Sequence, residues 1–416
     1  MVKVHFVTFG CKANQYDTEA FRQELQARGA RVVDVAGEAD ACVVNTCTVT
    51  NAADAEARKA IRRLRRANPG LRIVVAGCSA ALRADEYEAM DEVFGVVPGH
   101  DATVVAGLVA PQMHVGRDEE AIGGELLERN RRGTRGWLKI QDGCDRRCSF
   151  CATRLARGAS RSRTPDEIVA EAKLLSRHHR ELVFTGVHIG HYGLDLEATT
   201  TLSALVERLV EEVEGVRFRL GSIEATEIDD HLAALLAEAP NLVPHLHVPM
   251  QSGADRILRK MRRWHTREQY RARVLQIADA LPYLGLGADV IVGFPSESDE
   301  DHAQTRALVE ELPFTYLHVF PYSERDGTYA ATLNDPVDGR VKASRSLELR
   351  ALAQAKGDAY MRARVGQAAE IVVEGSNIGI TEDYLRVALT GEPAQRVGDV
   401  VYAGLRWGPF GLEARV

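Results

Sequence analysis

The chain has 416 residues, of which 45% are hydrophobic and 27% charged, proportions typical of a soluble globular protein with two or three domains. Its net charge of −7 gives it no general attraction to nucleic acid. No uninterrupted apolar run reaches the roughly 18 residues of a membrane helix, and the first residues lack the layout of a signal peptide. We therefore expect a cytoplasmic protein with no membrane partner.

Three strand-like runs near the start of the chain each end in a cysteine. VHFVTFGC ends at Cys11, ACVVNTC at Cys47 and IVVAGC at Cys78, and helix-like stretches follow them. This alternation predicts a parallel sheet with covering helices, a flavodoxin-like α/β domain over residues 1–111. Because ligands bind at the carboxyl ends of parallel strands, we expect the three cysteines at one edge of the sheet. Cys42 begins its run instead, and we interpret it as a small core residue.

The next two segments differ in pattern. Residues 112–134 are charged, contain a GG pair and lack an apolar period, which predicts an interdomain linker. Six strand-like runs then alternate with helix-like stretches: WLKIQDGC, ELVFTGVHIG, VRFRLGSIEA, HLHVPMQSG, LGADVIVGFP and TYLHVFPYS. Six β/α units in series predict a TIM-type barrel or an open part of one, with its functional loops at the strand C-termini. We assign this domain to residues 135–358.

A helix is predicted over residues 340–363, and short β-type runs broken by Gly and Pro follow it. These runs predict a small all-β barrel over residues 359–416. Elsewhere, three segments are strongly basic: 58–66, 146–163 and 256–273. Such segments can follow a phosphate backbone, although a solvated helix face is the alternative.

The segment GCDRRCSFCATR places Cys144, Cys148 and Cys151 in a C-x3-C-x2-C spacing. The chain has seven cysteines, none after Cys151, and this odd, clustered set argues against a disulfide framework. A structural zinc site needs four ligands, and no fourth Cys or His stands at a suitable spacing. Three thiolates on one loop suit a [4Fe–4S] cluster with one open iron, whereas a zinc loop and incidental cysteines are the alternatives.

This spacing at the end of the first strand of a β/α barrel resembles the radical S-adenosylmethionine enzymes. The resemblance implies that the open iron holds S-adenosylmethionine, which one electron cleaves to give a 5′-deoxyadenosyl radical. The strand ends TGVHIG, GSIEA, QSG and VGFP are similar to the other cofactor contacts of that superfamily. The resemblance thus implies contacts from Thr185, Gly186, Ser222, Gln251 and Gly293, with a simple turn role as the alternative for each.

The upstream segments FGCKANQYDTE, NTCTVT and VVAGC, placed before such a barrel, resemble the methylthiotransferases. This resemblance covers nearly the whole chain and implies a C-terminal RNA-binding barrel of the TRAM type. It also implies a second [4Fe–4S] cluster on Cys11, Cys47 and Cys78 that takes part in delivering sulfur, with zinc as the alternative. Two molecules of S-adenosylmethionine are implied, one as methyl donor and one as radical source, together with an electron donor and a sulfur source.

The stretches GCKANQYDTE and FTGVHIGHYG resemble the branch that modifies C2 of N6-threonylcarbamoyladenosine, next to the anticodon of tRNA, at position 37. The isopentenyladenosine branch usually has a Gln-Asn-Val segment where this chain has Val187–His188–Ile189, and a ribosomal-protein aspartate is the third substrate of the family. The three basic segments would then steer the anticodon stem-loop.

One position departs from the family pattern. Arg154 stands where the family commonly has a proline, which should loosen the loop and adds a cation that could hold RNA phosphate. Two other hypotheses stay open: a non-catalytic RNA-binding protein with structural zinc, and a radical enzyme whose first domain has only a structural role.

Overall fold

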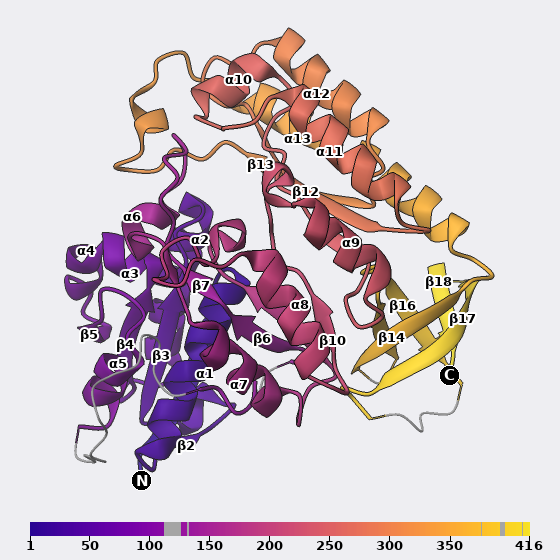
Figure 1. Ribbon diagram of the computed structural model, residues 1–416. Helices are drawn as coiled ribbons and strands as arrows, with labels where there is room; N and C mark the ends of the chain where they lie inside the picture. The colour runs from indigo at the N-terminus through magenta and orange to yellow at the C-terminus, as the bar shows by residue number, and fades with distance from the viewer. Residues whose placement is uncertain (112–125, 131–132, 376, 392–395, 410) are drawn as a thin grey trace.

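The computed structural model describes residues 1–111, 126–130, 133–375, 377–391, 396–409 and 411–416 (Figure 1). The predicted linker 112–134 therefore lies largely outside the described residues. No helix within these ranges combines the length and the apolar character that crossing a bilayer requires. Figure 1 shows the N-terminal sheet and the C-terminal barrel on opposite sides of a curved central domain.

The N-terminal domain is a five-stranded parallel sheet in the order β2-β1-β3-β4-β5, as the alternating pattern predicts. Successive strand residues face opposite sides, so Val43 packs toward α1 and α5, and Val44 toward α2 and α4. Cys42 is fully buried in β3, which confirms its core role. The strands are β1 (Lys3–Thr8), β2 (Arg31–Val32), β3 (Ala41–Thr46), β4 (Arg72–Gly77) and β5 (Val93–Val96). The helices are α1 (Lys12–Ala27), α2 (Asn51–Ala67), α3 (Cys78–Leu82), α4 (Ala84–Glu88) and α5 (Ala102–Val109).

The central domain has six parallel strands in chain order, paired as β6-β9-β10 and β11-β12-β13. Two isolated bridges, Phe218↔Leu242 and Ser222↔His247, join the two sheets into one curved wall. The strands are β6 (Gly136–Lys139), β9 (Glu181–Thr185), β10 (Arg217–Arg219), β11 (His245–His247), β12 (Gly285–Val292) and β13 (Tyr316–Pro321), with the small hairpin β7 (Gln141–Asp142) and β8 (Arg161–Ser162). The helices are α6 (Thr153–Arg157), α7 (Pro165–Leu175), α8 (Leu202–Glu212), α9 (Asp230–Glu238), α10 (Asp255–Lys260), α11 (Arg267–Asp279), α12 (Asp299–Glu311) and α13 (Gly339–Ala363).

This wall is an open half-barrel: within the described ranges, each of its two edge strands, β6 and β13, pairs with only one neighbouring strand. The N-terminal domain lies beside the β6 edge. There the Tyr16 hydroxyl of α1 donates to Glu171 of α7 at 3.1 Å, and the Lys139 ammonium of β6 lies 2.9 Å from Asp17 of α1. The N-terminal domain therefore covers part of the open side of the half-barrel.

The C-terminal barrel is closed in the order β14-β15-β16-β18-β17. Its strands are β14 (Ala368–Gly375), β15 (Ile378–Thr381), β16 (Arg386–Thr390), β17 (Val400–Gly408) and β18 (Gly411–Arg415). Two arginines of β10 attach it to the half-barrel: Arg217 donates to the Glu370 carbonyl at 2.7 Å and Arg219 to the Glu382 carbonyl at 2.8 Å. Glu181 of β9 pairs with both guanidinium groups, so the junction is a buried ionic cluster at the amino-terminal end of the strands.

Candidate functional site

The first cysteine site, here called the N-terminal cysteine site, comprises Cys11, Cys47 and Cys78. Because β1, β3 and β4 are adjacent and parallel, their carboxyl ends bring these three residues to one edge of the sheet. Cys47 and Cys78 are buried, and Cys11 is exposed at the start of α1. Gly10 has a φ of +99°, and a Cβ there would lie 2.8 Å from the Cys47 sulfur, so only glycine fits beside it.

The second cysteine site, here called the barrel cysteine site, comprises Cys144, Cys148 and Cys151. They lie on the loop between β7 and α6, and all three are half-buried. The Cys144 amide donates to the Gly158 carbonyl at 3.1 Å, and the Ser149 hydroxyl donates to the Lys260 carbonyl at 2.8 Å. The first bond holds the start of the loop and the second its middle, so contacts with the rest of the protein fix the backbone around the cysteines.

Each cysteine site has a guanidinium group against one of its sulfurs. Arg157 Nε lies 3.3 Å from Cys78 Sγ, and Arg263 Nη1 lies 3.5 Å from Cys148 Sγ. Burial raises the pKa of the Cys78 and Cys144 thiols to about 12, so at neutral pH a metal ion must displace their protons. The neighbouring cations favour the thiolate form that a metal requires.

One histidine also lies against a sulfur in each cysteine site. His100 Nε2 lies 3.5 Å from Cys78 Sγ, and His188 Nδ1 lies 3.5 Å from Cys144 Sγ. Sequence spacing alone missed both histidines, since neither is within 20 positions of its cysteine. The donor set at each site, three thiols with N–H groups directed at the sulfurs, fits a [4Fe–4S] cluster with one iron free of protein sulfur.

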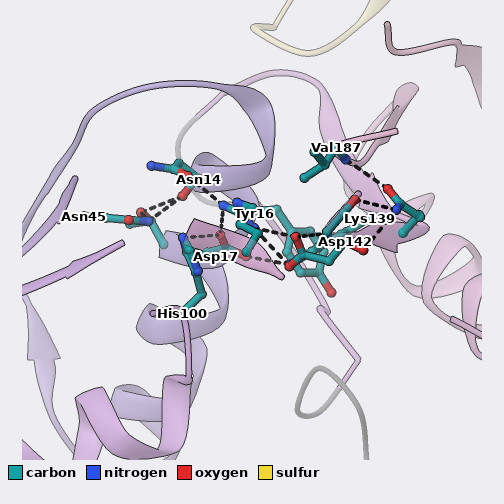
Figure 2. A network of polar contacts seen from close by, with 12 residues as sticks. Asn14, Tyr16, Asp17, Asn45, His100, Lys139, Asp142 and Val187 are labelled. Carbon is teal, nitrogen blue, oxygen red and sulfur yellow. Dashed lines mark hydrogen bonds and ion pairs between the residues drawn. The ribbon is translucent and has the colours of Figure 1, made fainter. Parts of the chain in front are cut away.

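A buried network joins the two cysteine sites (Figure 2). The side chain of Arg157 is 1% exposed, and besides contacting Cys78 it pairs with Asp17 of α1 at 2.7 Å and with Asp142 of β7 at 2.9 Å. Figure 2 shows Asn14 and Asp17 of the N-terminal domain facing Lys139 and Asp142 of the half-barrel. Since Asp142 precedes the cysteine loop by two positions, one guanidinium group holds parts of both sites in place.

The five predicted cofactor contacts lie at one rim of the half-barrel. Thr185 ends β9 and Gly186 follows it, Ser222 follows β10, Gln251 follows β11 and Gly293 follows β12. Ser222 is exposed, whereas Thr185 is 2% exposed, and the Gly293 amide donates to Glu297 at 2.6 Å. Gln251 has a φ of +64°, a conformation that non-glycine residues hold mainly at functional sites. The rim is shared with the barrel cysteine site.

A polar cluster beside this rim was not predicted. His188 and His191 stack with ring centroids 4.0 Å apart, and both pair with Glu227. These hydrogen bonds, set against the opposing effect of burial, lower the pKa of Glu227 to about 2. The cluster thus fixes the orientation of His188 toward Cys144.

The inner face of the half-barrel is polar. On β12, Leu286, Ala288, Val290 and Val292 pack toward the outer helices, which leaves Asp289 on the inner face. His247 of β11 and His318 of β13 lie 3.1 Å and 3.2 Å from Asp289. Lys12, the residue after Cys11, is influenced by the charges at the base of the half-barrel: burial and the cations Arg135 and Arg219 lower its pKa to about 8.

Two of the three basic segments, 146–163 and 256–273, do not form uniformly basic surfaces, because several of their arginines pair with carboxylates. Arg157 and Arg163 are buried in ion pairs with Asp17, Asp142 and Glu171, and Arg263 pairs with Glu224. In 256–273, half-buried Arg271 pairs with Glu311, and Arg273 pairs with Asp230. The predicted RNA-steering role of these segments therefore narrows to the arginines that have no acidic partner.

Two family models match this sequence. The model described as "Uncharacterized protein family UPF0004" matches residues 3–99, and that of the "Radical SAM superfamily" matches residues 138–309. Among solved structures, the radical S-adenosylmethionine methyltransferase TsrM from Kitasatospora setae has a TM-score of 0.54 at 17% identity, covering 80% of this chain and 75% of that chain. This likeness concerns the fold alone.

Relatives with higher identity extend over most of the chain. The threonylcarbamoyladenosine tRNA methylthiotransferase MtaB of Bacillus subtilis is 37% identical over 94% of this chain and 91% of its own length. The enzyme of that name from Rickettsia prowazekii is 35% identical over 93% and 91%. A tRNA-2-methylthio-N(6)-dimethylallyladenosine synthase from Geobacillus thermodenitrificans is 32% identical over 90% and 74%.

Proposed function

Because this chain belongs to the radical S-adenosylmethionine tRNA methylthiotransferases, we propose that it replaces the C2 hydrogen of N6-threonylcarbamoyladenosine at position 37 of tRNA with a methylthio group. One observation carries the proposal: two three-cysteine sites meet at one domain interface, with Arg157 in contact with a cysteine of one and with the strand that leads into the other. A reaction that needs a radical source and a sulfur-transfer site close together calls for this arrangement.

In this proposal the barrel cysteine site and the N-terminal cysteine site each hold a [4Fe–4S] cluster. When bound, the barrel cluster supplies the electron that cleaves S-adenosylmethionine, and the second cluster supplies the site of sulfur transfer. The chain's own residues position and shield these groups. Arg157 and Arg263 stabilise cysteine sulfurs as thiolates, and Thr185, Gly186, Ser222, Gln251 and Gly293 bind the cofactor along the rim.

The choice of adenosine derivative rests on the polar inner face. The threonylcarbamoyl group carries a carboxylate, a hydroxyl and N–H groups, whereas the isopentenyl group is purely apolar. Lys12, Asp289 and the two histidines next to Asp289 can form hydrogen bonds or ion pairs with the threonylcarbamoyl group. They can form none with the isopentenyl group. As substrates, we rank the isopentenyl derivative and a ribosomal-protein aspartate below the threonylcarbamoyl derivative.

We propose the division into residues 1–111, the linker 112–134, the radical domain 135–358 and an RNA-binding barrel of the TRAM type from 359 to 416. The boundary at 358 lies inside α13, which would connect the last two parts rigidly. The proposal also requires an electron donor, a sulfur source and the anticodon stem-loop of tRNA as partners, in the cytoplasm.

Nucleoside mass spectrometry of tRNA from a deletion strain tests the substrate. We expect loss of the methylthio group from threonylcarbamoyladenosine alone; loss from isopentenyladenosine instead would overturn the choice of substrate.

Anaerobically purified protein should contain about eight irons per chain, whereas a colourless protein with stoichiometric zinc would support the non-catalytic alternative. Cys47→Ala should leave cofactor cleavage intact and abolish the methylthio product, and unchanged product would reduce the first domain to a structural role.

A further inference from the structure

A pocket beside the barrel cysteine site is lined by arginines. It has a volume of about 350 Å³, and its walls include Arg146, Arg147, Arg154 and Arg262 together with Tyr329. Cys148 and Cys151 also line it, so it lies directly against the loop that would hold the radical-generating cluster. Its charge and its place make it a candidate anion site.

Most of the positive charge in this pocket is unneutralised. Arg146 pairs with Glu227 at 3.1 Å. Over the described part of the chain, by contrast, the side chains of Arg147, Arg154 and Arg262 form neither an ion pair nor a hydrogen bond, and Arg154 Nε is buried without a partner. Arg157, Arg163 and Arg263 of the same basic segments pair with carboxylates, whereas three of the four arginines that line this pocket do not. Three like charges held together without carboxylate partners favour a bound anion.

Two of the pocket's arginines are held in place by aromatic rings. Tyr329 is 49% exposed, and the Arg262 guanidinium lies 4.0 Å from its ring centroid. The Arg146 guanidinium lies 4.0 Å from the Trp264 ring. Stacked arginines keep their N–H groups free for phosphate oxygens, and an exposed tyrosine offers a surface for a nucleobase.

We propose that this pocket binds a backbone phosphate of the RNA substrate, on a nucleotide next to the target adenosine. The inference rests on the proposed function, because the target base must reach the space beside the cysteine loop. Arg147, Arg154 and Arg262 contact the phosphodiester, and Tyr329 packs against the sugar or base. Arg154 thereby acquires a role in holding RNA.

The test measures the dissociation constant of an anticodon stem-loop carrying threonylcarbamoyladenosine at several KCl concentrations, using the full chain with its iron. Arg147→Gln, Arg154→Gln and Arg262→Gln should each weaken binding about tenfold and lower the slope of log Kd against log salt by about one. Arg154→Lys should retain most of the salt slope, since it keeps the charge. Arg306→Gln on α12, which removes an exposed arginine paired with Glu310, is the matched control and should change neither quantity.

The outcomes separate this inference from the proposed function. If the unaltered chain does not bind the stem-loop at all, the proposed function fails. If it binds and forms product while the three variants match it in affinity and salt slope, only the pocket assignment fails. Variants that bind RNA normally but are reduced more slowly by an acidic redox protein would overturn the RNA assignment in favour of a protein-docking surface. Iron content and melting temperature, measured for every variant, exclude misfolding as the cause.

Discussion

The N-terminal cysteine site collects its ligands from three strand ends between residues 11 and 78, whereas the barrel cysteine site lies on one loop between residues 144 and 151. The first site needs the whole sheet in register, and a residue of another domain, Arg157, lies against its sulfur. The second is fixed by local backbone bonds and by Arg263 of its own domain. Domain docking therefore brings a cation against a sulfur of the first site, whereas it reaches the second site only through the pair of Arg157 with Asp142.

The largest expected effect comes from removing Arg157. Arg157→Leu leaves Asp17 and Asp142 as buried carboxylates without this partner and should lower the free energy of unfolding by about 3–5 kcal/mol. Denaturant unfolding measures the loss, and iron analysis should show metal missing chiefly from the N-terminal cysteine site. Arg263→Leu is the matched change at the other site, where Glu224 alone loses its partner. Equal iron loss from both sites in both variants would contradict the comparison.

Acid should weaken the same interface. Burial alone would raise the pKa of Asp17, but Lys139 and Arg157 outweigh it and lower the pKa below its ordinary value. A carboxyl group of this kind contributes stability above its unfolded pKa, near 4, and loses it as the pH falls through the folded pKa. The free energy of unfolding should therefore fall below about pH 4, and Asp17→Asn should reduce that dependence. An unchanged pH profile in the variant would assign the acid response to other groups.

A smaller effect is expected from the glycine beside Cys47. Gly10→Ala places a Cβ 2.7 Å from Cys47 Cβ at a φ of +99°, which should cost about 2 kcal/mol and displace that cysteine. Gly37→Ala is the control, because the nearest atom would be 4.0 Å away. Iron content after reconstitution should fall for Gly10→Ala and stay unchanged for Gly37→Ala. A loss in both would point to general destabilisation.

The sequence predicted those parts of the molecule that depend on local pattern. The C-x3-C-x2-C loop is contiguous, and strand ends in a parallel sheet align whatever the loops between them do, so the positions of all six cysteines followed from simple rules. The closed C-terminal barrel likewise followed from short β-type runs broken by Gly and Pro.

The long-range contacts to the cysteines could not be predicted in this way. Arg157 and Cys78 are 79 positions apart in different domains, and Arg263 and Cys148 are 115 apart within one domain. The first contact depends on how two domains dock and the second on how distant parts of one domain pack, and no periodicity records either. For the same reason a count of basic residues could not separate Arg163, buried against Glu171, from Arg154, which lines the pocket.

The smallest expected effect comes from changing Lys12, the residue next to the N-terminal cysteine site. Lys12 follows Cys11 directly, and its lowered pKa reflects burial near Arg135 and Arg219 at the base of the half-barrel. Its ammonium group is the cation next to Cys11 that we expect to pair with the substrate carboxylate. Lys12→Gln should lower kcat/KM for the threonylcarbamoyl stem-loop about tenfold, equivalent to about 1.4 kcal/mol, and leave S-adenosylmethionine cleavage without RNA unchanged. Gln15→Ala, an exposed change on the same helix, is the control. Equal activity of Lys12→Gln and the unaltered chain would remove Lys12 from substrate recognition and leave that task to the half-barrel alone.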